Sequence, residues 1–252
     1  MNLNNFFKKN EVDDFAIISA DKISAPAGFH PKDLMSSSKS VIIFAKQIPD
    51  FIFLTDNKSK TNYLYALIRE MDKISYELVN KIIKEGYRTI PLPCFFPVKL
   101  KNGKLRGYLS YKHIAEQAGM GSIGLNSLLI SGKYGNRLCL SAVITEKEFT
   151  VKKRDLKKSL CIKCNRCIES CPSRAIKNGN VKLSKCINFS SQVPVFLMPL
   201  FKLFMKWNLT SKYMEALINT LSWNIEMICS ECLINCPYFK KTNTKNNKKN
   251  AG

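Results

Sequence analysis

Eight of the ten cysteines follow a spacing that is typical of iron–sulfur clusters. Their order is Cys161-x2-Cys164-x2-Cys167-x3-Cys171-Pro172, then Cys186 alone, then Cys229-x2-Cys232-x3-Cys236-Pro237. In a ferredoxin signature of this form, the fourth cysteine ligates the other cluster, and eight thiolates suffice for two [4Fe–4S] clusters. We therefore predict that one cluster is held by Cys161, Cys164, Cys167 and Cys236, and the second by Cys171, Cys186, Cys229 and Cys232.

Disulfide bonds and zinc are the two alternatives for these cysteines. Disulfides are typical of secreted proteins, and residues 1–14 do not read as a signal peptide. Zinc sites usually present two C-x2-C knuckles rather than a C-x2-C-x2-C-x3-C-P run. The spacing therefore favours iron–sulfur clusters over both. Because the N-terminus also lacks a membrane anchor, we expect a cytoplasmic protein in a reducing, anaerobic setting.

The chain is strongly basic, with 40 Lys and Arg against 19 Asp and Glu and a formal net charge of +21. Such a charge suits nucleic acid, an anionic membrane surface, or an acidic protein that delivers electrons. A lysine-rich surface without any specific partner is an equal alternative, because much of the excess is spread along the chain. Positive charge is concentrated at 152–158 and in the tail, residues 241–252, which we expect to be disordered.

Residues 1–150 are expected to form an α/β domain that holds a cofactor and a substrate. Short apolar or alternating runs predict strands in this part of the chain. The predicted strands are 15–19, 41–45, 89–92, 127–131 and 137–145. Pro26, Gly28 and Pro31 mark the link between the first two strands as a loop.

Two helices are expected between these strands. Apolar residues recur three and four positions apart over 61–85, with Lys and Glu opposite, and Gly86 should end this helix. A shorter helix is predicted over 111–118, with Gly119 as its stop. Helices that alternate with strands over short links predict a central sheet with helices on its faces.

Residues 151–240 are expected to form a second, ferredoxin-like domain that holds the clusters. Its two cysteine groups are separated by a hydrophobic insert, 187–228, in which Pro194 and Pro199 interrupt a run too short to span a membrane. We favour a cover over the clusters or the substrate pocket, because clusters need dry walls to set their potential. The alternative is a membrane-surface or dimer contact through residues 193–207.

The segment Gly119-Met-Gly121-Ser-Ile-Gly124 has the form G-x-G-x-x-G. A dinucleotide-binding turn of this form follows a strand and opens a helix. This segment instead follows a predicted helix and precedes a predicted strand. The Rossmann interpretation is therefore disfavoured.

The same segment carries a more specific match, which runs from His113 to Ile130 and continues at Tyr134-Gly135 and at 140–145. This stretch resembles the core of the epoxyqueuosine reductase family and of the related corrinoid reductive dehalogenases. The order of the cysteines that follow is similar to the double-cluster arrangement of that family. The resemblance extends over about residues 15–238.

The resemblance implies a nitroreductase-like, cobalamin-binding fold for the N-terminal domain, followed by the ferredoxin-like double [4Fe–4S] domain. The clusters would pass electrons from a low-potential donor of the ferredoxin or flavodoxin type to base-off cobalamin, which would carry out a two-electron reduction of a substrate. Residues near Cys186 and Cys229 would lie close to the cobalt. Glycines let a backbone approach a flat cofactor closely. The implied cofactor-binding residues are Gly119, Gly121, Gly124, Asn126 and Ser131.

Departures from the family pattern bear on the substrate. The tRNA-modifying reductases have an Asp proton donor shortly before the glycine turn, whereas residues 105–113 contain no carboxylate. Tyr108, Tyr111 or His113 could take its place, and ordinary packing is the alternative for each tyrosine. Ser122 and Leu125 stand where the family often has Trp and Lys. The chain also ends without the helical-repeat region that helps to grip tRNA, so we expect a small-molecule or corrinoid substrate ahead of tRNA.

These observations leave three functional hypotheses. The first is a cobalamin- and [4Fe–4S]-dependent reductase acting on an unidentified substrate. The second is a ferredoxin-type electron-transfer protein that serves a partner enzyme, for which the N-terminal domain is larger than required. The third is a tRNA-modifying reductase, which the positive charge suggests.

Three remaining residues of reactive types are expected to be structural. Cys94 and Cys139 are predicted to be buried small hydrophobes rather than reactive thiols. His30 lies between Phe29 and Pro31, and no second ligand accompanies it, so a metal role is not expected.

Overall fold

The computed structural model describes residues 1–95, 99–101, 104–151, 154, 159–177, 179–182, 185–190, 213, 215, 216 and 226–240. Several predictions fall mainly outside these residues. They concern the lysine-rich stretch 152–158, the hydrophobic insert from residue 191 onward with its contact segment 193–207, and the basic tail 241–252.

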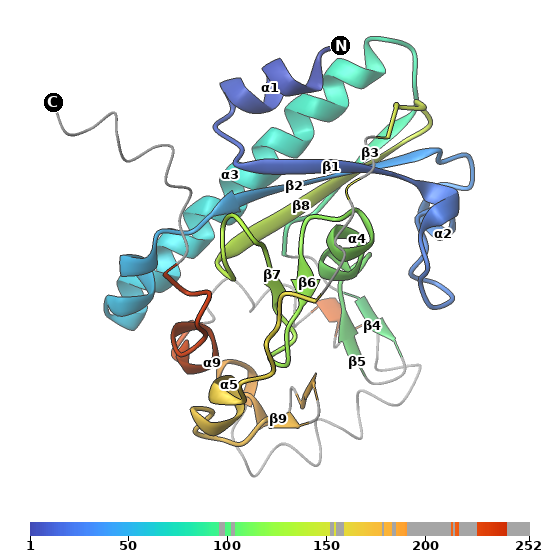
Figure 1. Cartoon of the computed structure of the whole chain (residues 1–252). Coiled ribbons are helices and arrows are strands. Elements are labelled where there is room, and N and C mark those ends of the chain that lie inside the picture. The colour runs from blue at the N-terminus through green and yellow to red at the C-terminus, as the bar shows by residue number, and fades with distance from the viewer. Residues whose placement is uncertain are drawn as a thin grey trace, which may run out of the picture.

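A four-stranded antiparallel sheet forms the centre of the molecule, in the order β1-β2-β8-β3 (Figure 1). Phe44 in the middle of the sheet lies opposite Phe15 on one side and Ser141 on the other. The mixed α/β fold expected from the sequence is present, and its antiparallel pairing is of the α+β type. These strands confirm four of the five predicted strands: β1 (Asp14–Ser19), β2 (Ser40–Gln47), β3 (Thr89–Leu92) and β8 (Leu138–Thr145).

Both faces of the sheet are buried, and each face has its own apolar core. On β2, Ile42 and Phe44 face one core, while Val41, Ile43 and Ala45 face the other. The first core is covered by α1 (Leu3–Lys9) and α3 (Asn57–Ile83), and the second by α4 (Tyr111–Gln117) (Figure 1). A strand buried on both faces must be apolar at successive positions, which is why 41–45 is a continuous apolar run.

The long helix α3 begins four residues before the predicted start at residue 61. Asp56 caps it, because its carboxylate accepts hydrogen bonds from the backbone N–H groups of Lys58 and Ser59, both at 3.0 Å. The apolar periodicity could not reveal this first turn, which is polar. Gly86, with a φ of +89°, follows the end of the helix as predicted.

Several short elements were not predicted. They are α1, the 3₁₀ helices η1 (Ala20–Lys22) and η2 (Asp50–Leu54), α2 (Pro31–Leu34), and the hairpin of β4 (Lys99–Lys101) with β5 (Lys104–Arg106). Helix α2 lies at the end of the predicted loop, and His30 caps it by accepting the backbone N–H of Lys32 through Nδ1 at 3.2 Å. This histidine therefore has a local structural role.

The predicted strand 127–131 is shorter in the structure. It is reduced to β7 (Leu129–Ile130), which pairs with β6 (Ser122–Ile123) inside the glycine-rich segment. Ser127 has a left-handed φ of +61°, and the side chain of Asn126 accepts the backbone N–H of Leu128 at 3.2 Å. This turn delays the strand by two residues and makes the glycine-rich segment one arm of a hairpin.

The cysteine-bearing segments form short elements that lie below the sheet in Figure 1. These are α5 (Arg166–Glu169), β9 (Ile176–Lys177), β10 (Asn180–Val181), α6 (Ile187–Ser190) and α9 (Glu231–Ile234). After α9 the chain returns to the first core, where the Phe239 ring packs edge-on to Phe53 at 6.1 Å between centroids. Among the described residues, no helix combines the length and apolarity needed to cross a membrane.

Candidate functional site

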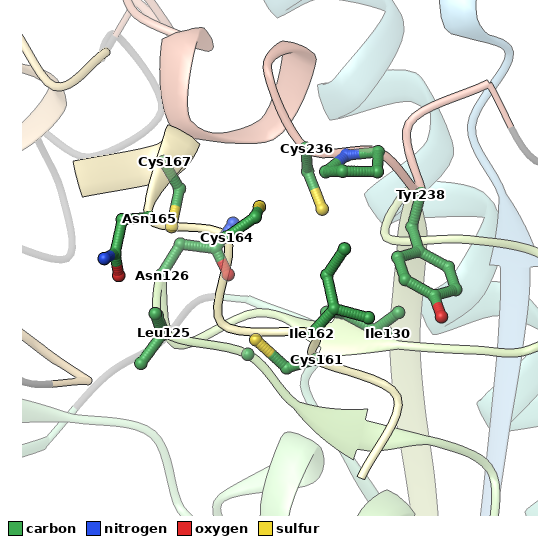
Figure 2. A pocket seen from close by; sticks show the side chains of 12 residues that line it. Leu125, Asn126, Ile130, Cys161, Ile162, Cys164, Asn165, Cys167, Cys236 and Tyr238 are labelled. Atoms are coloured by element: carbon green, nitrogen blue, oxygen red, sulfur yellow. The ribbon is translucent and has the colours of Figure 1, made fainter. Parts of the chain in front are cut away.

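Cys161, Cys164, Cys167 and Cys236 line one pocket, although Cys236 is about seventy residues away in sequence. Figure 2 shows the four sulfur atoms arranged around a common space. The pocket encloses about 340 Å³, including space open to solvent. The rest of its wall is largely apolar and consists of Gly124, Leu125, Asn126, Ile130, Ile162, Asn165, Pro237 and Tyr238.

Left-handed residues bend the first cysteine loop around this pocket. Lys163 and Asn165, on either side of Cys164, have φ values of +52° and +61°. Asn adopts this conformation readily, whereas Lys does so at a cost. Asn165 then caps α5, which carries Cys167. The x2 spacing therefore brings three thiols to one side of the loop.

Cys171, Cys186, Cys229 and Cys232 form the second group. Burial, followed by the nearby thiols of Cys229, Cys186 and Cys171 in that order, raises the pKa of Cys232 to about 12. Cys229 is held by Asn188, whose side chain accepts the backbone N–H of Cys229 and donates to its carbonyl, both at 2.8 Å. This pair of bonds joins the beginning of the hydrophobic insert to the residue that follows its end.

The first group shows the same electrostatic behaviour. Burial, followed by the thiols of Cys236, Cys161 and Cys164, raises the pKa of Cys167, and burial also raises that of Cys236. Four adjacent thiolates repel one another, so they need a cationic centre to be stable as anions. Iron in a cluster supplies such a centre.

Cys171 differs from the other cysteines. Burial opposes ionisation of its thiol, but hydrogen bonds from the backbone of Ala175, from Ser173 and from Ile176 together lower its pKa. The N–H of Ala175 lies 3.2 Å from the sulfur. Such N–H···S bonds are one of the means by which proteins tune cluster potentials.

The arrangement of the first cysteine group suits a cluster. Its four sulfurs surround one pocket (Figure 2). A cubane cluster presents its iron atoms at separate corners, so its thiolates lie further apart than those around one zinc ion. Within the part of the chain that the structure describes, no three His, Cys, Asp or Glu side chains converge on one ion-sized site.

The glycine-rich hairpin lies against the cysteine segments, but its glycines are packed within the protein. A Cβ on Gly119 would lie 2.4 Å from the carbonyl oxygen of Arg154, and one on Gly121 would lie 2.3 Å from that of Ile130. Gly119 also has a φ of +75° and ends α4 as predicted. The need for glycine at both positions is therefore explained without a cofactor.

The other three predicted cofactor residues divide between the pocket and the hairpin. Gly124 and Asn126 line the pocket. Asn126 donates its side-chain amide to the carbonyl of Cys232 at 2.9 Å. Ser131 is buried, and its hydroxyl accepts the backbone N–H groups of Lys133 and Tyr134, both at 3.3 Å.

The three proton-donor candidates have different surroundings. Tyr111 is buried and donates its hydroxyl to the carbonyl of Pro93 at 2.6 Å, and burial raises its pKa well above the usual range. Burial and then the charge of Lys112 lower the pKa of His113, whose Nδ1 lies 2.6 Å from the Ser110 hydroxyl. Tyr108 is half-buried at the edge of the second core.

Sequence reasoning missed the residues that hold the cysteine segments in place. Asn188 and Thr61 do so without belonging to any motif, and Thr61 accepts the backbone N–H of Met227 at 2.8 Å. For Asn188 a weak signal existed, because it stands two residues after Cys186 in a stretch of apolar neighbours. Thr61 gave none, since it lies far from the cysteines in sequence.

Comparison with known proteins identifies an iron–sulfur segment and a related family of reductases. Residues 156–177 match the family model of a 4Fe-4S binding domain. The epoxyqueuosine reductase of Listeria monocytogenes is 32% identical over 143 residues, which make up 56% of this chain and 32% of the relative. That of Bacillus anthracis is 28% identical over 172 residues, or 67% of this chain and 44% of the relative. The chain thus spans less than half the length of these relatives.

Solved structures show the same fold. The epoxyqueuosine reductase of Streptococcus thermophilus superimposes with a TM-score of 0.62 at 17% identity, covering 96% of this chain and 66% of that one. A reductive dehalogenase, described as B12-dependent, gives a TM-score of 0.56 at 14% identity, with 83% and 34% covered. The expected resemblance to epoxyqueuosine reductases and reductive dehalogenases is confirmed.

Proposed function

We propose, from its similarity to the epoxyqueuosine reductases, that this protein is a reductase in which two [4Fe–4S] clusters deliver electrons to cobalamin. The observation that carries the proposal is the gathering of eight cysteines into two groups of four, on a fold shared with those enzymes. The ligand sets are those expected from the sequence. Electrons enter from a low-potential donor of the ferredoxin or flavodoxin type.

The two clusters would lie close enough for rapid electron transfer. Cys167 and Cys171 are four residues apart around α5, and Cys232 and Cys236 are four apart around α9. Each pair has one member in each group. Because four residues of chain reach at most about 14 Å, two such pairs would keep the groups near each other. The thiol of Cys167 also acts on that of Cys232, which places the two groups within electrostatic range.

Cobalamin enters the proposal through the resemblance alone. Two of the predicted contacts, Gly124 and Asn126, line the pocket of the first cysteine group, so they would lie against that cluster. Gly119 and Gly121 would shape the turn rather than touch the ring, because Arg154 and Ile130 occupy their open sides. When bound, cobalamin would supply a metal centre for two-electron reduction.

For the substrate we propose epoxyqueuosine in a tRNA stem–loop. This choice reverses the order reached from the sequence, where a small molecule ranked ahead of tRNA. The curated relatives described above are named epoxyqueuosine reductases, and one solved relative was determined with an epoxyqueuosine-modified tRNA stem loop. A net charge of +21 suits a phosphate backbone.

Tyr108 is the proton donor that we propose in place of the family's carboxylate. Tyr111 has its hydroxyl bound to the Pro93 carbonyl, and the lowered pKa of His113 leaves this imidazole largely unprotonated at neutral pH. Tyr108 precedes α4 by three residues and is only half-buried. A substrate above the glycine turn could therefore approach it.

Anaerobic EPR of the reconstituted protein, with and without cobalamin, tests the proposal. We expect signals from two reduced [4Fe–4S] clusters and one bound, base-off cobalt per chain. Two clusters without bound cobalt would contradict the cobalamin step and favour the electron-carrier hypothesis. Fewer than two clusters would contradict the ligand assignment itself.

Binding of an epoxyqueuosine-containing tRNA stem–loop tests the substrate. Affinity should fall steeply as salt rises, because phosphate contacts release counterions. Turnover of the stem–loop to the queuosine form should require both clusters. Absence of both binding and turnover would contradict tRNA as the substrate and leave the reductase class intact.

A further inference from the structure

Lys60 is a buried lysine beside the second cysteine group. Its residue exposure is only 4%, although lysines are almost never fully buried unless they are paired. The ammonium donates to the side-chain oxygen of Asn57 at 3.0 Å. Lys58, two residues earlier on the same helix, is exposed. The burial of Lys60 is thus specific to its position.

The segment that leads into Cys229 is hydrogen-bonded to the residue next to this lysine. Thr61, the next residue, accepts the backbone N–H of Met227 through its hydroxyl at 2.8 Å, and Cys229 follows two residues later. Figure 1 shows the start of α3 beside the red segment that carries α9. The two hydrogen bonds of Asn188 fix the backbone of Cys229 in this place.

Cys229 is the nearby acidic group with the largest effect on Lys60. Burial lowers the pKa of the ammonium, while the charges of Cys229, then Glu231, then Asp56 act in the opposite direction. Glu231 and Asp56 are exposed, so solvent screens them more strongly than the half-buried Cys229. This order agrees with the hydrogen bond from Met227 to Thr61, which holds the chain two residues before Cys229 against the start of α3.

We propose that Lys60 is a positioning residue that raises the reduction potential of the cluster held by Cys171, Cys186, Cys229 and Cys232. The inference rests on the proposed function, since it requires that cluster. Reduction adds one electron and hence one negative charge to the cluster. A fixed ammonium in a water-poor site stabilises this charge more than it stabilises the oxidised state.

The start of α3 strengthens the same effect. The unpaired N–H groups of the first helical turn carry partial positive charge, and the side chain of Asp56 satisfies only two of them. Lys60 lies in this first turn, so the helix terminus adds partial positive charge near the ammonium. Loss of the ammonium alone should still be measurable, because the ammonium carries a full charge and the helix terminus only a partial one.

Potentiometric EPR titration of the holoprotein with dithionite tests the inference. In Lys60→Gln, we expect the equilibrium constant for reduction of one cluster to fall about tenfold, which is about 59 mV for one electron. The potential of the other cluster should not change. Lys60→Arg keeps the charge, so both cluster potentials should match those of the wild type. Lys58→Gln removes an exposed lysine from the same turn and should leave both potentials unchanged.

Unchanged potentials in Lys60→Gln would overturn the inference. Should the neutral variant lose the cluster instead, iron content in Lys60→Arg decides the matter. If Lys60→Arg retains the cluster at its original potential, the result supports a role for the charge. If Lys60→Arg loses the cluster as well, Lys60 has a packing role and the inference is overturned. Failure of the proposed function is distinct, because the wild-type protein would then lack two cluster signals before any substitution.

Discussion

The side-chain amide of Asn126 donates a hydrogen bond to the backbone carbonyl of Cys232 at 2.9 Å. The two residues are 106 positions apart in sequence. The bond connects the glycine-rich hairpin directly to the helix that carries a cysteine of the second group. Through its oxygen, the same side chain accepts the N–H of Leu128, so it also shapes the turn.

Replacement of Asn126 by Ala should loosen both contacts. We expect a loss of roughly 1–3 kcal/mol in the free energy of unfolding, because a half-buried carbonyl is left without its partner. Iron should also be released faster to a chelator. Urea titration and chelation kinetics of the holoprotein measure the two effects. The exposed Asn4→Ala in α1 is the control, and equal iron release in both variants would contradict a link between hairpin and cluster.

Single cysteine substitutions should separate the two clusters. Cys161→Ala and Cys229→Ala should each lower the iron content from about eight to about four atoms per chain, and each should remove a different EPR signal. Cys94→Ala and Cys139→Ala remove thiols outside both groups and should retain about eight. A loss of the same signal from Cys161→Ala and Cys229→Ala would show that the ligand sets are wrong.

Glycine at position 121 should be required by packing. In Gly121→Ala the new Cβ would lie 2.3 Å from the Ile130 carbonyl oxygen, so β6 and β7 must move apart. We expect a cost of roughly 2 kcal/mol or more in the free energy of unfolding. In Gly132→Ala the nearest atom lies at an ordinary 3.9 Å, and stability should change by less than about 0.5 kcal/mol. Equal urea midpoints for the two variants would contradict this account.

Arg137 should anchor the chain that follows Cys236, because it binds the carbonyl of Phe239. Its guanidinium is 1% exposed and donates to the carbonyls of Phe239 and Ile48. Arg137→Ala leaves two buried acceptors without partners, so we expect a loss of roughly 2–4 kcal/mol in a urea titration. Arg88, which is exposed and pairs with Glu146, provides the control. Its replacement by Ala should cost less than about 1 kcal/mol.

The pH dependence of turnover should identify the proton donor. The pKa of His113 is lowered from 6.5, so its protonated fraction falls as pH rises through a value below 6.5. If Tyr108 is the donor, the rate should not follow the protonation of His113, and Tyr108→Phe should lower it roughly 100-fold. His113→Gln should leave it within about twofold. A rate that falls with rising pH in the wild type and becomes flat in His113→Gln would instead assign the role to His113.

The main strands, the helices over 61–85 and 111–118 and the cysteine spacing could be predicted because each depends on local spacing. A strand buried on both faces must be apolar throughout, as residues 41–45 are, and a cluster needs thiols at short intervals. Short elements such as α2 and β6 could not be predicted in this way. Their ends depend on single caps and turns, such as those of His30 and Ser127, which give no periodic signal.

Tertiary structure alone decided which distant residues meet. Cys94 and Cys139 looked like two unrelated apolar positions, yet their sulfurs lie 3.4 Å apart, because the end of β3 runs beside β8. Their mutual hydrogen bond, followed by burial, raises the pKa of Cys94 well above the usual range, which agrees with an unreactive thiol.

The sequence by itself determined the chemistry that this chain can support, since residue type and local spacing set which thiols can share a cluster. It did not determine what surrounds that chemistry. The burial of Lys60 near the Cys229 segment, the bond from Asn126 to Cys232 and the filling of the Gly119 and Gly121 positions by backbone all arise from long-range packing. Such contacts depend on how the whole chain folds onto its sheet, which no local pattern encodes.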